Sequence, residues 1–297
     1  MKLLFRSTAV CGTVFAFVIT SVTCMSVAGA APTGSGGVPV IVLGDSYASN
    51  SMEIQAQGAD RCSHGADSWP SQLSRSINRG LLDLSCSGAV IDSGQNWNLA
   101  YEAGQAADAG AFGPDTEAVL LQFGLNDSWG NSLDAIDTVM FCVVRGCERD
   151  AVAPYRLPDP NQITAEHYAD RIAQVVKYIR YYAPRARIML IGYPELLDPA
   201  GTAACIDLFG VPVAQPRATA LIDLLNSLRN AQAGAADLLG IDFLDTAALT
   251  HGHGLCTPDP WVNGIGDPRA DVFGIPGHPS ARGDAVTAAA IKRQLNL

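Results

Sequence analysis

The stretch IVLGDSYAS, residues 41–49, decides how this chain can fold. It continues an apolar, β-branched run from residue 38, which predicts a buried strand over residues 38–43. The run breaks at Gly44-Asp45-Ser46, so a serine stands at the carboxyl end of the strand, where open α/β sheets bind ligands. The Ser46 hydroxyl becomes a nucleophile there if a histidine reaches it. The alternative is that Asp45 and Ser46 only cap the following turn.

Apolar runs and amphipathic stretches alternate along the rest of the chain. Four further runs predict strands, at residues 81–86, 118–123, 187–193 and 241–244. Helices are expected over residues 69–77, between the cap Thr164 and Pro184, from Leu221 to about Gly240, and after the cap Ser280. This alternation predicts a three-layer α/β/α sandwich with a five-stranded parallel sheet.

Two segments stand outside this alternation. Residues 133–158 contain a cysteine pair and two prolines, and we expect an excursion that adds nothing to the sheet. Residues 251–279 are rich in histidine, glycine and proline. They predict a long loop, and loops of that length usually serve a function.

The first 30 residues have the pattern of a secretory signal peptide. Lys2 and Arg6 precede an apolar segment, and Ala28-Gly29-Ala30 suits cleavage. Removing 30 of the 297 residues leaves 267, enough for one α/β domain over residues 31–297. Cleavage removes two basic residues and no acidic one, which takes the formal net charge from −10 to −12. We therefore expect an extracellular monomer, with no integral membrane segment and no nucleic-acid partner.

Six of the eight cysteines lie beyond the predicted cleavage site. An even number in an exported chain predicts three disulfides, although several pairings are possible. Sequence order favours bonds between neighbours along the chain: Cys62–Cys86, Cys142–Cys147 and Cys205–Cys256.

A serine nucleophile needs a histidine as its base, and the chain has five: His64, His167, His251, His253 and His278. His278 lies in Gly277-His278-Pro279-Ser280, between the long loop and the last helix, from where it can project toward a strand end. Of the other four, His64 lies in a polar loop and His167 at a solvent-facing helix position, and His251 and His253 form a closely spaced pair. That pair raises a metal site as an alternative, which is disfavoured because no third ligand stands at a recognised spacing.

Acyl transfer also needs donors for a developing oxyanion. The candidates are the backbone N–H of Ser46, the backbone N–H of Gly88 and the side-chain amide of Asn126, each just after a predicted strand. Because the carboxyl ends of parallel strands share one edge of the sheet, we expect the three to converge. Read singly, Gly88 and Asn126 are equally typical of turns.

These residues together resemble a known family. Gly44-Asp45-Ser46, Gly88, residues 124–127 (GLND) and His278-Pro279 resemble the four blocks of the SGNH hydrolases, the GDSL esterase/lipase family. Residues 85–89 (SCSGA) and 252–261 also resemble its secreted actinobacterial branch, in which three disulfides are usual. The resemblance implies a flavodoxin-like sandwich, hydrolysis of carboxylic esters and no cofactor.

The sequence departs from the family at one position. The family usually has an aspartate three residues before the histidine, where this chain has Ile275. Asp271 could fold back to replace it, but we expect instead that the backbone carbonyl of Ile275 accepts the Nδ1–H of His278. A neutral acceptor fixes the tautomer and stabilises the imidazolium less than a carboxylate does.

The substrate class stays open between acyl esters of lipids, a phospholipid, and an acetylated carbohydrate. Apolar residues expected near the site favour acyl chains: Tyr47, Trp97, Leu125, Trp129, Phe273 and Ile275. A non-catalytic secreted binding protein on the same scaffold is a further alternative. No G-x-S-x-G elbow surrounds any serine, which disfavours the α/β-hydrolase fold.

Overall fold

The structure of the protein is a computed structural model that describes residues 36–52, 62–93, 97–130, 135–148 and 160–297. All of them belong to one compact unit, Ala31–Leu297. The predicted signal peptide, residues 1–30, lies outside the described residues, as do parts of the predicted excursion at residues 133–158. That signal peptide and the assignment of residues 31–297 to a single domain stay predictions.

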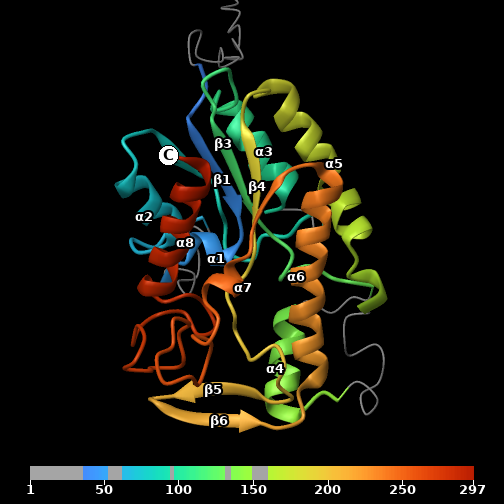
Figure 1. Ribbon diagram of the computed structural model, residues 1–297, viewed down its shortest axis with the longest axis vertical. Coiled ribbons are helices and arrows are strands. Elements are labelled where there is room, and N and C mark those ends of the chain that lie inside the picture. Colours follow the sequence, from blue (N-terminus) through green and yellow to red (C-terminus); the bar gives the residue numbers. More distant parts are fainter. Residues whose placement is uncertain (1–35, 53–61, 94–96, 131–134, 149–159) are drawn as a thin grey trace, which may run out of the picture. The chain divides into compact units, whose positions relative to one another are not determined.

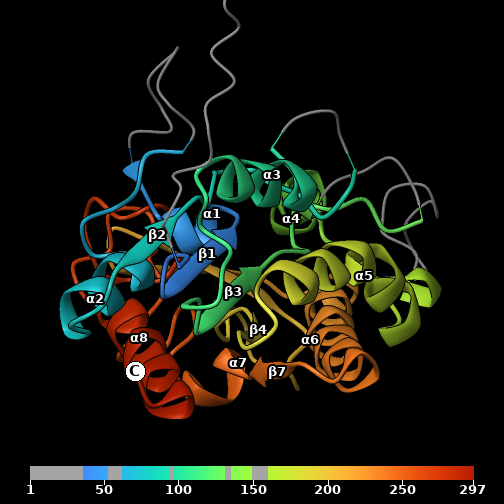
Figure 2. The same ribbon diagram turned by 90° about the horizontal axis from the view of Figure 1, so that it is seen from above.

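A five-stranded sheet forms the centre of the fold, with the order β2-β1-β3-β4-β7 and all neighbours parallel. This confirms the predicted fold class, and the order is that of flavodoxin-like sheets. The five strands, visible in Figures 1 and 2, are β1 (Val40–Gly44), β2 (Leu81–Asp83), β3 (Ala118–Gln122), β4 (Arg187–Ile191) and β7 (Asp242–Leu244).

Both faces of the sheet are buried, which explains why its inner strands are continuous apolar runs. Every residue of β1 and of β3 is buried. Side chains alternate along each strand, so Ile41 and Leu43 enter one core while Val40 and Val42 enter the other. The two cores together fix the register of the central strands.

Helices cover the two faces in separate groups (Figure 2). One core is closed by α2 (Trp69–Ser76) and α8 (Ala281–Leu295), and the other by α3 (Leu99–Asp108), α5 (Ala165–Tyr182) and α6 (Thr219–Leu239). Polar side chains cap the first residues of most of these helices: Ser68, Asn98, Thr164 and Ser280.

The remaining elements lie toward the carboxyl ends of the strands. Short helices α1 (Ser46–Ser49) and α7 (Thr246–Leu249) directly follow β1 and β7. A separate antiparallel hairpin, β5 (Ala204–Leu208) with β6 (Val211–Gln215), packs near α4 (Ala135–Arg145), at the lower end of Figure 1. The 3₁₀ turn η4 (Pro160–Gln162) precedes α5.

The sequence patterns did not indicate α3, α4 or the hairpin. The buried face of α3 consists of one leucine, two alanines and a glutamate, so it lacks a clear apolar stripe. The hairpin is missed because the residues of β6 are exposed and its side chains show no core-directed pattern.

The structure contains three disulfides, and they are the pairs favoured by sequence order: Cys62–Cys86, Cys142–Cys147 and Cys205–Cys256. The third pair joins β5 to the long loop of residues 251–279. Among the residues that the structure describes, no helix combines the length and the apolar character that crossing a bilayer requires.

Candidate active site

The segments that follow β2, β1 and β3 run side by side beyond the sheet. The Cys86 N–H donates to the Gly44 carbonyl at 2.8 Å, and the Asp45 N–H donates to the Gln122 carbonyl at 3.0 Å. The hydrogen-bonded ladder therefore extends past the strands themselves. It brings the residues after all three strands to the point where the strand order reverses, which is where such sheets bind ligands.

Ser46 lies at this point as the first residue of α1, and His278 reaches it. The Nε2 atom of His278 lies 2.8 Å from the Oγ atom of Ser46. A side chain at position 44 would prevent this turn, because an added Cβ would meet the Cβ of Ala48 at 2.8 Å. Gly44 therefore allows the chain to turn sharply from β1 into α1 and present the serine.

The loop before α8 holds His278 through backbone hydrogen bonds. The His278 carbonyl accepts from the Asn263 N–H at 2.8 Å, and the Asn263 carbonyl accepts from the Gly277 N–H at 2.8 Å. The same stretch ends at Ser280, whose hydroxyl accepts from the Gly283 N–H and caps α8. The imidazole is thus fixed between a paired loop and a helix start, as its position in the sequence indicated.

The group that orients the imidazole differs from the prediction. The Nδ1 atom of His278 lies 3.2 Å from the carbonyl oxygen of Pro276, not that of Ile275. The Ile275 carbonyl is occupied within its own turn, where it accepts the backbone N–H of His278 at 3.1 Å. Asp271 does not orient the ring either, because its carboxylate accepts from the Ala281 N–H at 2.6 Å. A neutral carbonyl is still the acceptor, one residue later than expected.

This arrangement suits a general base. With its proton on Nδ1 and donated to Pro276, the ring presents Nε2 as the acceptor toward Ser46. Burial lowers the pKa of His278 to about 4, and the carbonyl of Pro276 opposes that shift. The imidazole is therefore neutral near pH 7 and able to accept the serine proton.

Tyr47 packs the imidazole in place. Its ring stacks on His278 with centroids 4.4 Å apart and planes inclined by 23°. Its hydroxyl donates to the Gly277 carbonyl at 2.8 Å, next to the histidine. The residue after the proposed nucleophile thus supports the proposed base.

The predicted oxyanion donors gather at the same edge. Gly88 occupies a tight turn closed by the Ala89 N–H, which donates to the Cys86 carbonyl at 3.0 Å. The φ angle of Gly88 is +77°, a value that the third residue of a type II turn requires and that favours glycine. The N–H groups of Ser46 and Gly88 donate to no other residue within the described ranges. Both remain able to bind a developing negative charge.

Asn126 is oriented by the segment that carries Gly88. One N–H of its side chain donates to the Ala89 carbonyl at 3.0 Å, which leaves the second N–H for a ligand. The next residue strengthens the link, because the buried carboxylate of Asp127 accepts from the Ile91 N–H at 3.0 Å and pairs with Arg171. Burial raises the pKa of Asp127, and the positive charge of Arg171 opposes that shift.

Two supporting residues were not found from the sequence. The carboxyl of Glu102, buried on α3, accepts from the Gly44 N–H at 2.7 Å and so holds the backbone behind Ser46. Burial raises the pKa of Glu102 well above its usual value. Its only signal in the sequence is an acid on the buried face of a helix. The second residue, Tyr193, follows β4 and is considered below.

The other four histidines lie in different contacts. Nitrogen atoms of His64, His167 and His253 lie within hydrogen-bond distance of the carbonyls of Ser85, Gln162 and Asp259, and His251 pairs with the Glu195 carboxylate at 2.7 Å. His253 also stacks on Trp261. Across the described ranges, no cluster of three side chains of metal-ligand type occurs. His278 is therefore the histidine that the structure places against Ser46.

The apolar residues expected near the site divide into two groups. Tyr47, Leu125 and Trp129 are buried, and Trp97 packs against the same core, so these four belong to the core, where Tyr47 also supports His278. Phe273, with 85% of its surface exposed, lies with Ile275 in a groove of about 400 Å³. Pro279, the residue after His278, also lines this groove, whereas Ser46 and His278 themselves are not among its lining residues.

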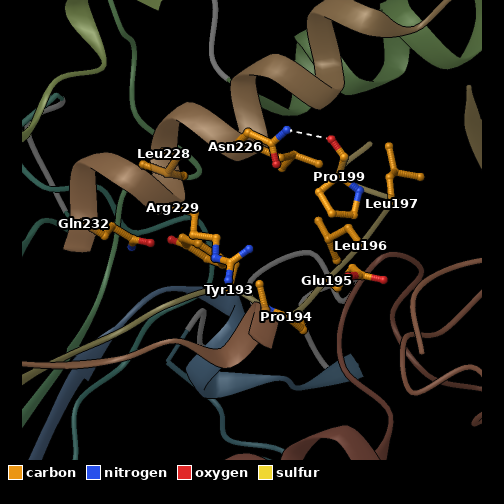
Figure 3. A pocket seen from close by; sticks show the side chains of 12 residues that line it. Tyr193, Pro194, Glu195, Leu196, Leu197, Pro199, Asn226, Leu228, Arg229 and Gln232 are labelled. Carbon is orange, nitrogen blue, oxygen red and sulfur yellow. Dashed lines mark hydrogen bonds between the residues drawn. The ribbon is translucent and has the colours of Figure 1, made fainter. Parts of the chain in front are cut away.

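A second, smaller cavity of about 40 Å³ lies beside Tyr193, between the segment after β4 and helix α6 (Figure 3). Its apolar lining includes Leu196, Leu225 and Leu228. This volume is far below that of ordinary ligand sites, which are about 300–1,000 Å³. The groove lined by Phe273 and Ile275 has the volume of an ordinary ligand site and is the better candidate for binding a substrate.

An α/β fold that pairs a serine with a histidine at this edge of the sheet is the arrangement expected of an ester hydrolase. The chain belongs to the GDSL-like Lipase/Acylhydrolase family, whose family model matches residues 42–286. It is therefore an enzyme of the carboxylic ester hydrolase class, as the resemblance implied.

Streptomyces proteins are among its relatives. The chain is 26% identical to an esterase of Streptomyces scabiei, over 89% of each chain. It is 24% identical to Lipase 2 of Streptomyces coelicolor, over 82% of this chain and 81% of the relative. Among solved structures, phospholipase A1 from Streptomyces albidoflavus superimposes with a TM-score of 0.60 at 21% identity, covering 87% of this chain and 99% of that one. The last likeness confirms the fold.

Proposed function

We propose that the protein is a secreted esterase or lipase that hydrolyses acyl esters with Ser46 as nucleophile and His278 as base. The observation that carries the proposal is the 2.8 Å contact between Ser46 Oγ and His278 Nε2 at the carboxyl edge of the sheet. Extracellular location is supported by the predicted signal peptide and by the three disulfides, which persist in oxidising surroundings.

The cycle has two halves. In the first, His278 takes the proton of Ser46 while the hydroxyl oxygen attacks the ester carbonyl, and the N–H groups of Ser46, Gly88 and Asn126 bind the oxyanion. The alcohol leaves with the proton from His278, and an acyl group remains on Ser46. In the second half, His278 activates a water molecule, which attacks the acyl-enzyme and releases the acid. No cofactor takes part.

The exposed apolar side chains of the groove favour an acyl chain over a sugar. Val272 and Phe273 are exposed by 45% and 85%, and they line the groove with Met52 and Ile275. Exposed apolar side chains gathered in one groove bind apolar ligands. Polar residues form another part of the lining, namely Asn50, Asp67, Ser68, Asn263 and Asp271. The relatives named esterase, lipase and phospholipase A1 are consistent with an acyl ester as substrate.

The test is hydrolysis of p-nitrophenyl esters from acetyl to palmitoyl, compared with release of acetate from acetylated xylan. We expect higher kcat/KM for chains longer than acetyl, and a fall for the longer chains when Phe273 is changed to Ser. Phe209→Ser is the matched control, because Phe209 is also exposed but lies at the hairpin turn. A preference for acetylated xylan would exclude the acyl-chain assignment.

A binding protein without activity is separated by a serine-reactive organophosphonate. Folded protein should be labelled at Ser46, and Ser46→Ala should abolish both labelling and hydrolysis. Stoichiometric binding of an ester without turnover or labelling would favour the binding protein.

A further inference from the structure

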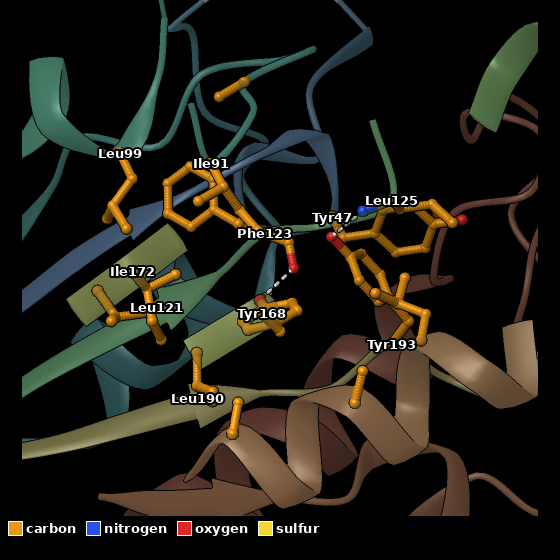
Figure 4. Close-up of a cluster of buried hydrophobic side chains, with 14 of the residues drawn as sticks. Tyr47, Ile91, Leu99, Leu121, Phe123, Leu125, Tyr168, Ile172, Leu190 and Tyr193 are labelled. Carbon is orange, nitrogen blue, oxygen red and sulfur yellow. Dashed lines mark hydrogen bonds between the residues drawn. The ribbon is translucent and has the colours of Figure 1, made fainter. Parts of the chain in front are cut away.

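Tyr193 lies directly behind the site, in the first residues after β4 (Figure 4). Only 8% of its surface is exposed. Its hydroxyl makes two hydrogen bonds: it donates to Asp45 Oδ2 at 2.5 Å and accepts from the Leu125 N–H at 3.0 Å. One oxygen atom thus joins the residue before Ser46 to the residue before Asn126.

The two partners belong to different strands and carry different parts of the site. Asp45 is the cap of α1, and its other carboxylate oxygen accepts from the Tyr47 N–H at 2.9 Å. Leu125 belongs to the loop after β3, and the residue that follows it is Asn126, the proposed oxyanion donor. The backbone ladder between β1 and β3 ends with the hydrogen bond from the Asp45 N–H to the Gln122 carbonyl. Beyond that point, the Tyr193 hydroxyl is a specific link between the two segments.

The ring of Tyr193 reaches the base as well. It packs edge-on against the ring of Tyr47, with centroids 4.9 Å apart and planes at 85°. The ring of Tyr47 in turn stacks on the imidazole of His278. Edge-to-face and stacked pairs of this kind are favourable geometries for aromatic rings. A single side chain therefore supports the nucleophile turn, the oxyanion loop and the imidazole.

We propose that Tyr193 is a positioning residue that fixes the Ser46 turn relative to the Asn126 loop. The proposal rests on the proposed function. Its physical basis is that small displacements of reacting groups cost large factors in rate, so a link between the two segments acts on kcat. Burial raises the pKa of the Tyr193 hydroxyl well above its usual value, so the group keeps its proton at every pH of interest.

Tyr193→Phe tests the link because it keeps the ring contact with Tyr47 and removes only the hydroxyl. We expect kcat to fall by about 10-fold to 100-fold with p-nitrophenyl butyrate, with KM within about twofold of wild type. The matched control is Tyr168→Phe. Tyr168 is also buried, and its hydroxyl donates to the Phe123 carbonyl, which keeps a second donor in Gln232. That control should keep kcat within about threefold of wild type.

A purely structural role would lower the thermal midpoint of both variants and leave kcat unchanged. Tyr193→Phe with kcat within about threefold of wild type would overturn the proposal. A change at Asp45 provides a second test, needed if Tyr193→Phe does not fold, because it alters the other end of the same bond. The variant that removes this link is Asp45→Ala, because Asn could donate its side-chain N–H to the Tyr193 oxygen and keep the two groups joined. Asp45→Ala should therefore lower kcat, and an Asp45→Ala enzyme with full kcat would also overturn the proposal.

The double variant checks that both act through one link. Tyr193→Phe combined with Asp45→Ala should be no slower than the slower single variant by more than about threefold, whereas independent effects would multiply. Ser46→Ala keeps this proposal apart from the proposed function. If Ser46→Ala retains activity, the assignment of the nucleophile fails; if it is inactive while Tyr193→Phe is normal, only the role of Tyr193 fails.

Discussion

Changing Asp271 to Ala should weaken the fold slightly and leave catalysis intact. Asp271 is the only aspartate near the family's usual position for the acid, but its carboxylate binds the first N–H of α8, at 2.6 Å from Ala281. A charged acceptor at a helix start contributes about 1 kcal/mol when exposed, from capping and the helix dipole together. For a domain of this size that loss lowers Tm by about 2–4 °C.

Activity gives the contrasting expectation. Loss of a carboxylate that orients a catalytic histidine lowers kcat by about 10⁴-fold, equivalent to about 5.5 kcal/mol. The Pro276 carbonyl orients His278, and a backbone group is not removed by substituting a side chain. Asp271→Ala should therefore keep kcat within about threefold of wild type, a change in activation free energy of less than about 0.7 kcal/mol.

Two measurements on the same protein samples decide the outcome. Thermal unfolding followed by circular dichroism gives Tm, and initial rates with p-nitrophenyl butyrate give kcat. Asp67→Ala is the control for loss of an exposed carboxylate. Among the described residues, the Asp67 side chain contacts only Arg75, at 3.5 Å, so the Tm of this variant should stay at the wild-type value. A fall in kcat of about 10³-fold or more with an unchanged fold would refute a serine–histidine pair without an acid.

Two further predictions concern the site itself. Asn126→Ala should lower kcat by about 10²–10³-fold with little change in KM, because the second N–H of the side chain is expected to bind the oxyanion. Steady-state kinetics of the folded variant measure this effect. An unchanged kcat would show that Asn126 is not part of the oxyanion hole. The acidic limb of kcat/KM should lie near pH 4, because burial lowers the pKa of His278 to about 4 and only the neutral ring accepts a proton. A midpoint of the acidic limb of kcat/KM near pH 6.5 would show that the ring is not desolvated. In the unfolded chain His278 binds its proton near pH 6.5, so this residue lowers the free energy of unfolding as pH falls from about 6.5 to 4. His278→Gln should reduce this pH dependence, measured by urea unfolding at several pH values.

The central strands and the order of the site residues could be predicted from local pattern alone. A strand buried on both faces must be apolar at nearly every position, so β1 and β3 show in the sequence as continuous runs ending at Gly44 and Gln122. Parallel strands place their carboxyl ends at one edge, which is why the positions of Ser46, Gly88 and Asn126 after three strands already indicated a common site.

Contacts made by loops and by single buried polar groups could not be predicted in this way. The acceptor of the His278 Nδ1–H depends on how one turn closes. It is the carbonyl of Pro276 and not the predicted carbonyl of Ile275, which accepts the backbone N–H of His278. Glu102 touches the nucleophile turn from a helix 58 positions away in the sequence. Nothing in the local pattern around it specifies such a partner.

By itself, the sequence predicted the class of fold, pointed to Ser46 and His278 as the site pair, and favoured the three disulfide pairs, because these follow from periodicity, strand ends and the order of the cysteines. Only the tertiary structure decided which carbonyl holds the imidazole, which acid holds the Gly44 N–H, and how Tyr193 joins two strand ends. Those choices depend on hydrogen bonds between groups distant in sequence, whose directions are set by the packing of both cores rather than by the residues beside them.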